Sequence, residues 1–266
     1  MTAPAGGRWS DLQARVISAS VMTLVGAVDI WLGGLPFTAL VVGLTGLMIW
    51  ELSRMIRPDR ARDAVILGGG AVAALVMTVT VDAVAARLAL LAVPVALSFV
   101  KTPDRWLFAL YAGMVMLAGY GLVSLRDIAG TAAIVWLILV VIASDVMGYF
   151  AGRSLGGPKF WPAISPKKTW SGTLAGWAGA TVVGLGFVLV TNAGWGLLIL
   201  SPVVAFAGQL GDIAESWIKR RTGVKDSSAL IPGHGGVLDR FDALIGATIA
   251  VLALGLILPL PLPAGN

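Results

Sequence analysis

The chain has 266 residues, of which 58% are hydrophobic and only 12% are charged, and its mean hydropathy is +0.90. A soluble domain carries roughly a quarter charged residues, so this composition excludes that class and predicts an all-α protein that crosses a membrane many times. The lack of cysteine excludes disulfides and thiolate metal sites, and a single histidine excludes a histidine-cluster zinc site. Any metal ion must therefore be held by oxygen, as Mg²⁺ is. The net charge of +5 is interpreted as a mark of cytoplasmic loops rather than of nucleic-acid binding.

The N-terminal segment, residues 1–15, carries two arginines before an apolar run, as a signal peptide does. No clear small-residue cleavage pattern follows, so we expect a retained first helix. In chain order, hydropathy predicts about nine spans, near residues 16–33, 36–54, 64–81, 86–100, 105–123, 129–151, 171–191, 195–214 and 239–261. The fourth is the weakest, because it is short and contains Pro94.

The distribution of basic residues predicts the orientation of these spans. With nine spans and a cytoplasmic N-terminus, 17 of the 19 lysines and arginines lie in cytoplasmic segments, and only Arg87 and Arg126 lie outside. Residues 1–266 then form one membrane domain. Within it, residues 1–124 are expected to be a scaffold that offers dimer contacts, and residues 125–266 carry the polar motifs, with cytosolic loops at 152–170 and 215–240.

The sixth predicted span contains a carboxylate, Asp145, about two turns before its cytoplasmic end. A charge inside a span is costly, so it faces either a structural partner or a functional polar cavity, and the second interpretation is favoured. The next loop contains the sequence SPKKT (165–169). Its two lysines, Lys167 and Lys168, fit a phosphate-binding loop and a further orientation signal equally well.

The eighth predicted span ends with four polar residues spaced i, i+3, i+4 and i+7, which places them on one helical stripe: Asp212, Glu215, Ser216 and Lys219. A stripe of this chemistry faces protein or a wet cavity rather than lipid. A solvated helix end is the alternative, and it suits Lys219 better than Asp212.

The ninth predicted span opens with Asp239 and Asp242, one helical turn apart. The eighth span enters the cytoplasm and the ninth leaves it, so Asp212 and Asp239 can converge on one ion. Carboxylates with open positions suit Mg²⁺, which takes further ligands from substrate phosphates. The glycines of the PGHGG turn (232–236) let backbone N–H groups approach an anion. Together these features predict a metal and polyphosphate site at the cytosolic membrane surface.

The block that ends at Asp242 resembles the signature of the phosphatidate cytidylyltransferase (CDP-diacylglycerol synthase) family. The matching positions are Ser216, Lys219, Arg220, Lys225, Asp226, Pro232, His234, Gly235, Gly236, Asp239, Arg240 and Asp242. The D-x-x-x-Y-x-x-G run that starts at Asp145 and the SPKKT loop are also similar to that family. One departure is Ser171, which stands where family members often have a glutamate, and no role is assigned to it.

The resemblance implies transfer of a cytidylyl group from CTP to phosphatidic acid, which yields CDP-diacylglycerol and pyrophosphate. It also implies Mg²⁺ as the cofactor, with room for a second, monovalent cation such as K⁺, and a homodimer whose polar cavity opens to the cytosol and laterally to lipid. We therefore expect CTP, phosphatidic acid and bilayer lipid as partners, no nucleic acid, and a place in the bacterial inner membrane.

The residues take three roles in this hypothesis. The expected metal ligands are Asp212, Asp239 and Asp242. The expected catalytic or orienting groups are Asp145, Asp226, Lys219 and His234, although His234 either hydrogen-bonds the leaving group or only pins the turn. The expected substrate-binding residues are Lys167, Lys168, Ser216, Arg220, Lys225 and Arg240.

A secondary transporter or ion-coupled carrier of a charged solute is the alternative from another class. The acids inside predicted spans, Asp29, Asp145 and Asp212, are compatible with it. Two features disfavour it: no inverted repeat is visible, and the polar groups gather at one face instead of the midplane. A CDP-alcohol phosphotransferase would need a DG-x2-AR-type run, which the sequence does not contain.

Overall fold

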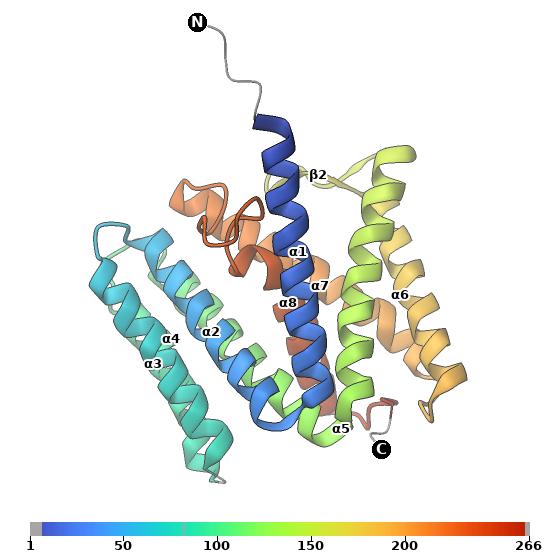
Figure 1. The fold of residues 1–266 in the computed structure, drawn as a ribbon, viewed down its shortest axis with the longest axis horizontal. Coiled ribbons are helices and arrows are strands. Elements are labelled where there is room, and N and C mark those ends of the chain that lie inside the picture. Colours follow the sequence, from blue (N-terminus) through green and yellow to red (C-terminus); the bar gives the residue numbers. More distant parts are fainter. Residues whose placement is uncertain (1–6, 82, 264–266) are drawn as a thin grey trace, which may run out of the picture.

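The computed structural model of the chain describes residues 7–81 and 83–263, and its elements confirm the all-α prediction (Figure 1). One short β-hairpin interrupts the helices. The elements are α1 (Gly7–Leu32), α2 (Gly34–Ile56), α3 (Ala61–Thr80), the 3-10 helix η1 (Val84–Leu91), α4 (Ala92–Ser98), α5 (Arg105–Ser154), β1 (Lys159–Trp161), β2 (Ser165–Thr169), α6 (Trp170–Val190), α7 (Leu197–Thr222) and α8 (Leu238–Gly255).

Within the described ranges, six helices are long and apolar enough to cross a membrane: α1 from residue 15 onward, α2, α3, α5, α6 and α7. Helix α5 has 50 residues and holds both the fifth and the sixth predicted spans, because it breaks at Gly130. The backbone there has a φ of 79°, a conformation that favours glycine. The break lies just inside the start of the sixth predicted span (129–151), so two spans within this helix are compatible with the backbone.

The fourth predicted span, residues 86–100, is not one membrane-length α-helix. Helices η1 and α4 together cover only residues 84–98, whereas a spanning α-helix needs about 20 residues. Pro94 lies in the first turn of α4, where its missing N–H breaks no intrahelical bond. Helix α8 has 18 residues and opens with three charges, so it is not among the six either. The predicted count of nine spans is not confirmed.

Two apolar cores hold the helices together, and α8 belongs to both. The first lies between α2, α3, α4, the first part of α5 and the ends of α7 and α8, and it includes Tyr111 and Ile245. The second lies between the second part of α5, α6, α7 and the middle of α8, and it includes Trp136 and Ala247. The first turn of α8 lies in the first core, and the helix passes into the second core between Ile245 and Ala247.

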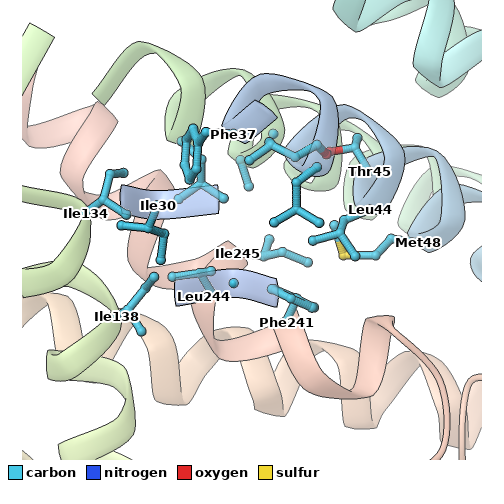
Figure 2. A pocket seen from close by; sticks show the side chains of 16 residues that line it. Ile30, Phe37, Leu44, Thr45, Met48, Ile134, Ile138, Phe241, Leu244 and Ile245 are labelled. Atoms are coloured by element: carbon cyan, nitrogen blue, oxygen red, sulfur yellow. The ribbon is translucent and has the colours of Figure 1, made fainter. Parts of the chain in front are cut away.

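Helix α1 lies against the outside of this bundle, with none of the residues of its apolar stretch buried (Figure 1). Between α1 and the helices α2, α5 and α8 lies an apolar cavity of about 100 Å³. Figure 2 shows Ile30 of α1, Phe37 and Leu44 of α2, and Phe241 and Ile245 of α8 around it. This first helix therefore covers the bundle instead of interlocking with it.

Candidate active site

Helices α7 and α8 approach each other closely at Gly211 and Gly246. A Cβ atom on Gly246 would lie 2.3 Å from the carbonyl oxygen of Ala207, and one on Gly211 would lie 2.4 Å from that of Asp242. Only residues without a side chain permit such an approach. The contact places Asp212 and Asp242 on neighbouring helix faces that line one cavity.

Helices α5 and α6 meet in the same way at Gly148 and Gly172. A Cβ atom on Gly172 would lie 2.6 Å from the carbonyl oxygen of Gly148. Asp145 stands one turn before Gly148 on α5 and lines the same cavity as Asp212. Two close helix contacts therefore bring carboxylates from α5, α7 and α8 around one space.

The predicted SPKKT loop is the strand β2, which pairs antiparallel with β1. The hairpin ends at Thr169, whose hydroxyl accepts a hydrogen bond of 3.2 Å from the N–H of Gly172 and so caps α6. This cap satisfies a donor that the first helical turn leaves without an intrahelical acceptor. Lys167 and Lys168 are consequently held on a short strand that is fixed to the start of α6.

The cavity has a volume of about 630 Å³. Its lining includes most of the predicted site residues, namely Asp145, Lys167, Lys168, Asp212, Lys219, Asp226, Asp239, Arg240 and Asp242. These residues come from α5, β2, α7, α8 and the α7–α8 loop (residues 223–237). The structure therefore joins the two polar regions that the sequence singled out.

A second polar cavity, of about 590 Å³, adjoins the first, because Asp226 and Arg240 line both. Lys225 and His234 line only the second, together with Arg15 of α1. The imidazole Nδ1 of His234 lies 3.2 Å from the hydroxyl of Ser18, which donates to the carbonyl oxygen of Pro232 at 2.8 Å. Helix α1 therefore contacts the PGHGG turn directly.

Two predicted substrate-binding residues line neither of these cavities. Ser216 donates a hydrogen bond of 3.3 Å to Oδ1 of Asp212, so it supports that carboxylate from one turn along α7. Arg220 is exposed in the last turn of the same helix.

Lysines face the carboxylates across the larger cavity. Lys168 places its Nζ 2.5 Å from Oδ2 of Asp212 and donates to the carbonyl oxygen of Gln209 at 3.1 Å. Lys219 places its Nζ 2.6 Å from Oδ1 of Asp239 and also pairs with Glu215, whose side chain is fully buried. The acids and bases of the site therefore largely neutralise one another.

The two acids of α8 have different surroundings. Oδ2 of Asp239 accepts three hydrogen bonds of 2.8 Å, from the N–H and the hydroxyl of Ser227 and from the N–H of Gly236. Asp242 accepts one, of 2.7 Å, from the N–H of Ala243. Within the described residues, no group of three or more acid or histidine side chains forms a ready metal cage. A hard cation would therefore need ligands from the substrate as well.

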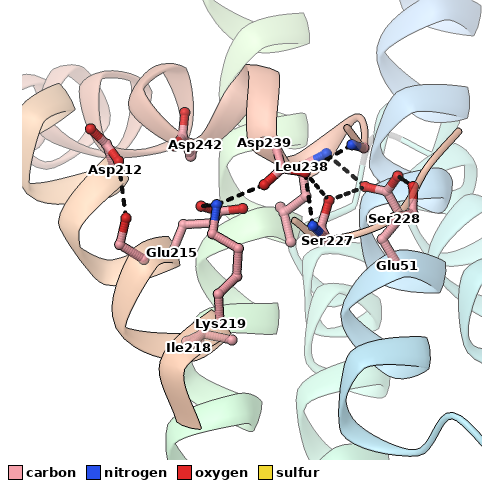
Figure 3. Close-up of polar contacts among 12 residues, drawn as sticks. Glu51, Asp212, Glu215, Ile218, Lys219, Ser227, Ser228, Leu238, Asp239 and Asp242 are labelled. Carbon is pink, nitrogen blue, oxygen red and sulfur yellow. Dashed lines mark hydrogen bonds and ion pairs between the residues drawn. The ribbon is translucent and has the colours of Figure 1, made fainter. Parts of the chain in front are cut away.

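Sequence reasoning missed one buried carboxylate next to the site, Glu51 of α2. It accepts hydrogen bonds from Ser227, Ser228, Val237 and Leu238 in and beside the α7–α8 loop (Figure 3). The signal that singled out Asp145, a lone acid inside an apolar span, is present at Glu51 too. Ser171, at the family's acidic position, donates to the carbonyl oxygen of Gly156 and lies outside the cavity lining.

Comparison with known proteins identifies the family. The model of the cytidylyltransferase family matches residues 13–258. A phosphatidate cytidylyltransferase of Brucella abortus (strain 9-941) is 36% identical over 95% of this chain and 96% of its own. Proteins of that name from Helicobacter pylori (strain 26695) and Staphylococcus saprophyticus are 40% and 44% identical over 54% and 42% of this chain, and over 54% and 44% of their own. The chain belongs to the cytidylyltransferase family.

Proposed function

We propose that this chain transfers a cytidylyl group from CTP to phosphatidate, the activity that the names of its relatives state. The observation that carries the proposal is the larger cavity, in which carboxylates from three helices face lysines and an arginine at the ends of apolar helices. Both substrates carry phosphates and one is a lipid, so the reaction needs this combination. Neither the family nor these relatives support a carrier, the alternative considered from sequence.

The proposed magnesium ligands are Asp212, Asp239 and Asp242, whose carboxylate oxygens are the hard donors that Mg²⁺ prefers. When bound, the ion supplies charge neutralisation and alignment of the phosphates. Among the described contacts, Asp242 accepts one hydrogen bond, whereas Asp212 pairs with Lys168 and accepts from Ser216. Asp239 can join them through Oδ1 only as Lys219 turns from it to a substrate phosphate, because its Oδ2 already accepts three hydrogen bonds.

A second, monovalent ion such as K⁺ remains a prediction from the family resemblance. No contact among the described residues singles out its ligands.

The cations of the site bind and align the phosphates in this proposal. Lys167, Lys168 and Arg240 line the larger cavity and meet the CTP triphosphate. Lys225 lines the adjoining cavity, and Arg220 is exposed in the last turn of α7. A phosphate oxygen of phosphatidate attacks the α-phosphorus of CTP, and the bond to the departing pyrophosphate breaks in line. The lipid phosphate is already ionised near neutral pH, since its second pKa is about 6, so no strong general base is needed.

The remaining site residues orient these groups. Asp145 on α5 and Asp226 in the α7–α8 loop both line the larger cavity. Ser216 supports Asp212. His234 keeps both predicted roles, contact with the leaving group or support of the turn, and its bond to Ser18 favours the second.

The proposal also covers the membrane topology, the cellular location and the oligomeric state of the protein. We infer nine membrane crossings, a cytoplasmic N-terminus, a site that faces the cytosol of a bacterium at its inner membrane, and a homodimer. The uneven distribution of lysines and arginines and the six membrane-length helices support the crossings. The homodimer rests on the family resemblance alone.

The direct test measures CDP-diacylglycerol formed by the purified protein in detergent from CTP, phosphatidate and Mg²⁺. The variants Asp212→Asn and Asp242→Asn are expected to lose activity by about 100-fold or more, because each removes a charged ligand of the proposed Mg²⁺ that would neutralise the phosphates. The exposed Asp59→Asn is the matched control and keeps full activity. Near wild-type activity in both site variants refutes the metal assignment, and a wild-type protein that consumes no CTP refutes the function.

A further inference from the structure

Glu51 is fully buried near the end of α2, a helix of the N-terminal part that carries none of the predicted site residues. Figure 3 shows four donors around its carboxylate. Oε1 accepts from the hydroxyl of Ser228 at 2.6 Å and from the N–H of Val237 at 2.9 Å. Oε2 accepts from the N–H of Leu238 at 2.7 Å and from the hydroxyl of Ser227 at 3.2 Å. The side chain therefore fastens the α7–α8 loop and the start of α8 to α2.

The backbone contacts act as a cap for α8. The first N–H groups of a helix have no intrahelical acceptor, and a negative charge is favourable beside them. Helix α8 has no side-chain cap from Val237, the residue at its N-cap position. Glu51 supplies the missing acceptor from another helix, which fixes the direction in which α8 begins one residue before Asp239.

Ser227 connects this contact to the site. Its hydroxyl lies 3.2 Å from Oε2 of Glu51 and 2.8 Å from Oδ2 of Asp239, and its N–H donates to the same Asp239 oxygen. Asp239 in turn pairs with Lys219 at 2.6 Å. Glu51 of α2 and Asp239 of α8 thus both contact Ser227, which links the buried carboxylate to the one that lines the cavity.

There is little free space around this arrangement. A Cβ atom on Gly236 would lie 2.0 Å from the hydroxyl of Ser227 and 2.4 Å from Oε1 of Glu51. The loop consequently cannot shift toward α2 without displacing the carboxylate.

We propose that Glu51 is a positioning residue for the cytidylyl transfer. It does not line the cavity, and it acts by holding the α7–α8 loop so that Asp239 and Lys219 face the substrates. The effect on turnover rests on the proposed function, whereas the effect on the loop does not.

The variant Glu51→Gln tests this role, because it keeps the size of the side chain but replaces one acceptor oxygen by an NH₂ donor. Two of the four donors then lose their acceptor. We expect kcat to fall by about 10- to 100-fold, the range found when groups that orient metal-binding residues are removed, with smaller changes in KM for CTP and phosphatidate. Asp63→Asn is the matched control, since Asp63 lies at the start of α3 and pairs with Arg57 at 3.3 Å, away from the cavity. It is expected to keep wild-type kcat.

Ser228→Ala gives a second, milder variant that keeps the carboxylate and its two backbone contacts. It is expected to lower kcat by about 3- to 10-fold, less than the full effect of losing a hydrogen bond to a charged group, because the other three donors still hold the carboxylate. The double variant is expected to be no worse than Glu51→Gln alone, because both changes act through one contact and such effects are not additive. Losses of kcat that add in the double variant contradict the proposal. If Glu51→Gln does not fold, the kcat of Ser228→Ala is the test.

Amide hydrogen exchange separates positioning from general stability. In Glu51→Gln the amides of Val237 and Leu238 are expected to exchange faster, whereas those of α6 keep the wild-type rate. An unchanged kcat overturns the proposal, whether or not exchange at these amides rises. Uniformly faster exchange across the helices overturns it as well, because it shows a merely structural role. If the wild type makes no CDP-diacylglycerol, the function fails while the exchange result at Val237 still stands.

Discussion

Lys168 shows at the scale of single atoms how the site is balanced. Its Nζ lies 2.5 Å from the Asp212 carboxylate and 3.1 Å from the carbonyl oxygen of Gln209. Both contacts are on α7, whereas the lysine is on β2. In the proposed reaction this ammonium group leaves these acceptors for a phosphate oxygen of CTP.

Replacing Lys168 by methionine is expected to raise KM for CTP by about 10- to 100-fold, because a charge-assisted hydrogen bond contributes roughly 1.5–3 kcal/mol. Initial rates over a range of CTP concentrations measure this change. Lys159→Met, on the exposed strand β1 of the same hairpin, is the matched control and is expected to keep the wild-type KM. Equal KM values in the two variants would remove Lys168 from the substrate-binding residues.

Sequence patterns predicted the relative placement of neighbouring polar residues where the signal was local. Asp212, Glu215, Ser216 and Lys219 were placed on one stripe from their spacing, and Ser216 does bond Asp212 one turn away. Glu51 carries the same local signal as Asp145, an acid inside an apolar span, but its partners could not be predicted, because they lie 176 to 187 positions later in the chain and no helical spacing reveals them.

At the scale of elements, the contact between α7 and α8 sets the distance between their acids. Gly246 faces Gly211 so closely that a Cβ atom would lie 2.3 Å from the carbonyl oxygen of Ala207 and 3.0 Å from Cα of Gly211. A methyl group at this point can be accommodated only if the helices separate. The positions of Asp212 and Asp242 would then change together.

Gly246→Ala is therefore expected to destabilise the protein by about 1–3 kcal/mol, as overpacking of a close contact does, and to lower activity with it. Thermal unfolding in detergent measures the stability change. Gly186→Ala is the matched control, because this helical glycine of α6 has nothing within 4 Å of its added Cβ. The control is expected to be neutral or to stabilise by up to about 1 kcal/mol, since alanine favours a helix over glycine. Equal midpoints would show that α7 and α8 are not in tight contact.

Elements were predicted less completely than residues. The SPKKT segment was expected as a loop, but its pairing with β1 makes it a strand, and pairing depends on a partner segment that periodicity cannot show. The segment 84–98 has the composition of a span but only 15 residues in two helix types. Hydropathy predicted two spans, 105–123 and 129–151, within what is one helix with a break, and the break falls at Gly130, where a positive φ turns the chain.

At the scale of the whole molecule, the crossings can be tested because the sequence contains no cysteine. Single cysteines at Ala163 and Asn192, both exposed and on opposite ends of α6, are expected to react with a membrane-impermeant maleimide from opposite sides of the membrane, Ala163→Cys from the cytosol. The variants Val84→Cys and Thr102→Cys test by the same labelling whether the short segment that contains α4 crosses the membrane. If those two label from one side, that segment does not cross, and the nine-span proposal fails.

The overall class and the family were accessible from sequence because they depend on composition and on short motifs. Apolar runs gave the membrane helices, and the block that ends at Asp242 gave the family. The division of the core between two clusters, with α8 in both, was not accessible. It depends on which faces of separate helices meet. Nearly uniform apolar helices such as α6 have no polar or apolar stripe that would indicate which face is buried.

The bond between Glu51 and the start of α8 has a consequence for how the protein is made. A ribosome adds about 5–20 residues per second, so Glu51 is synthesised roughly 10 to 35 s before Ser227, which lies 176 positions later. A carboxylate is costly within a membrane, so we expect α2 to keep this end of the helix near the polar headgroups until then. The docking of α8 removes that cost, which makes the assembly of the site one of the last events in the biogenesis of the chain.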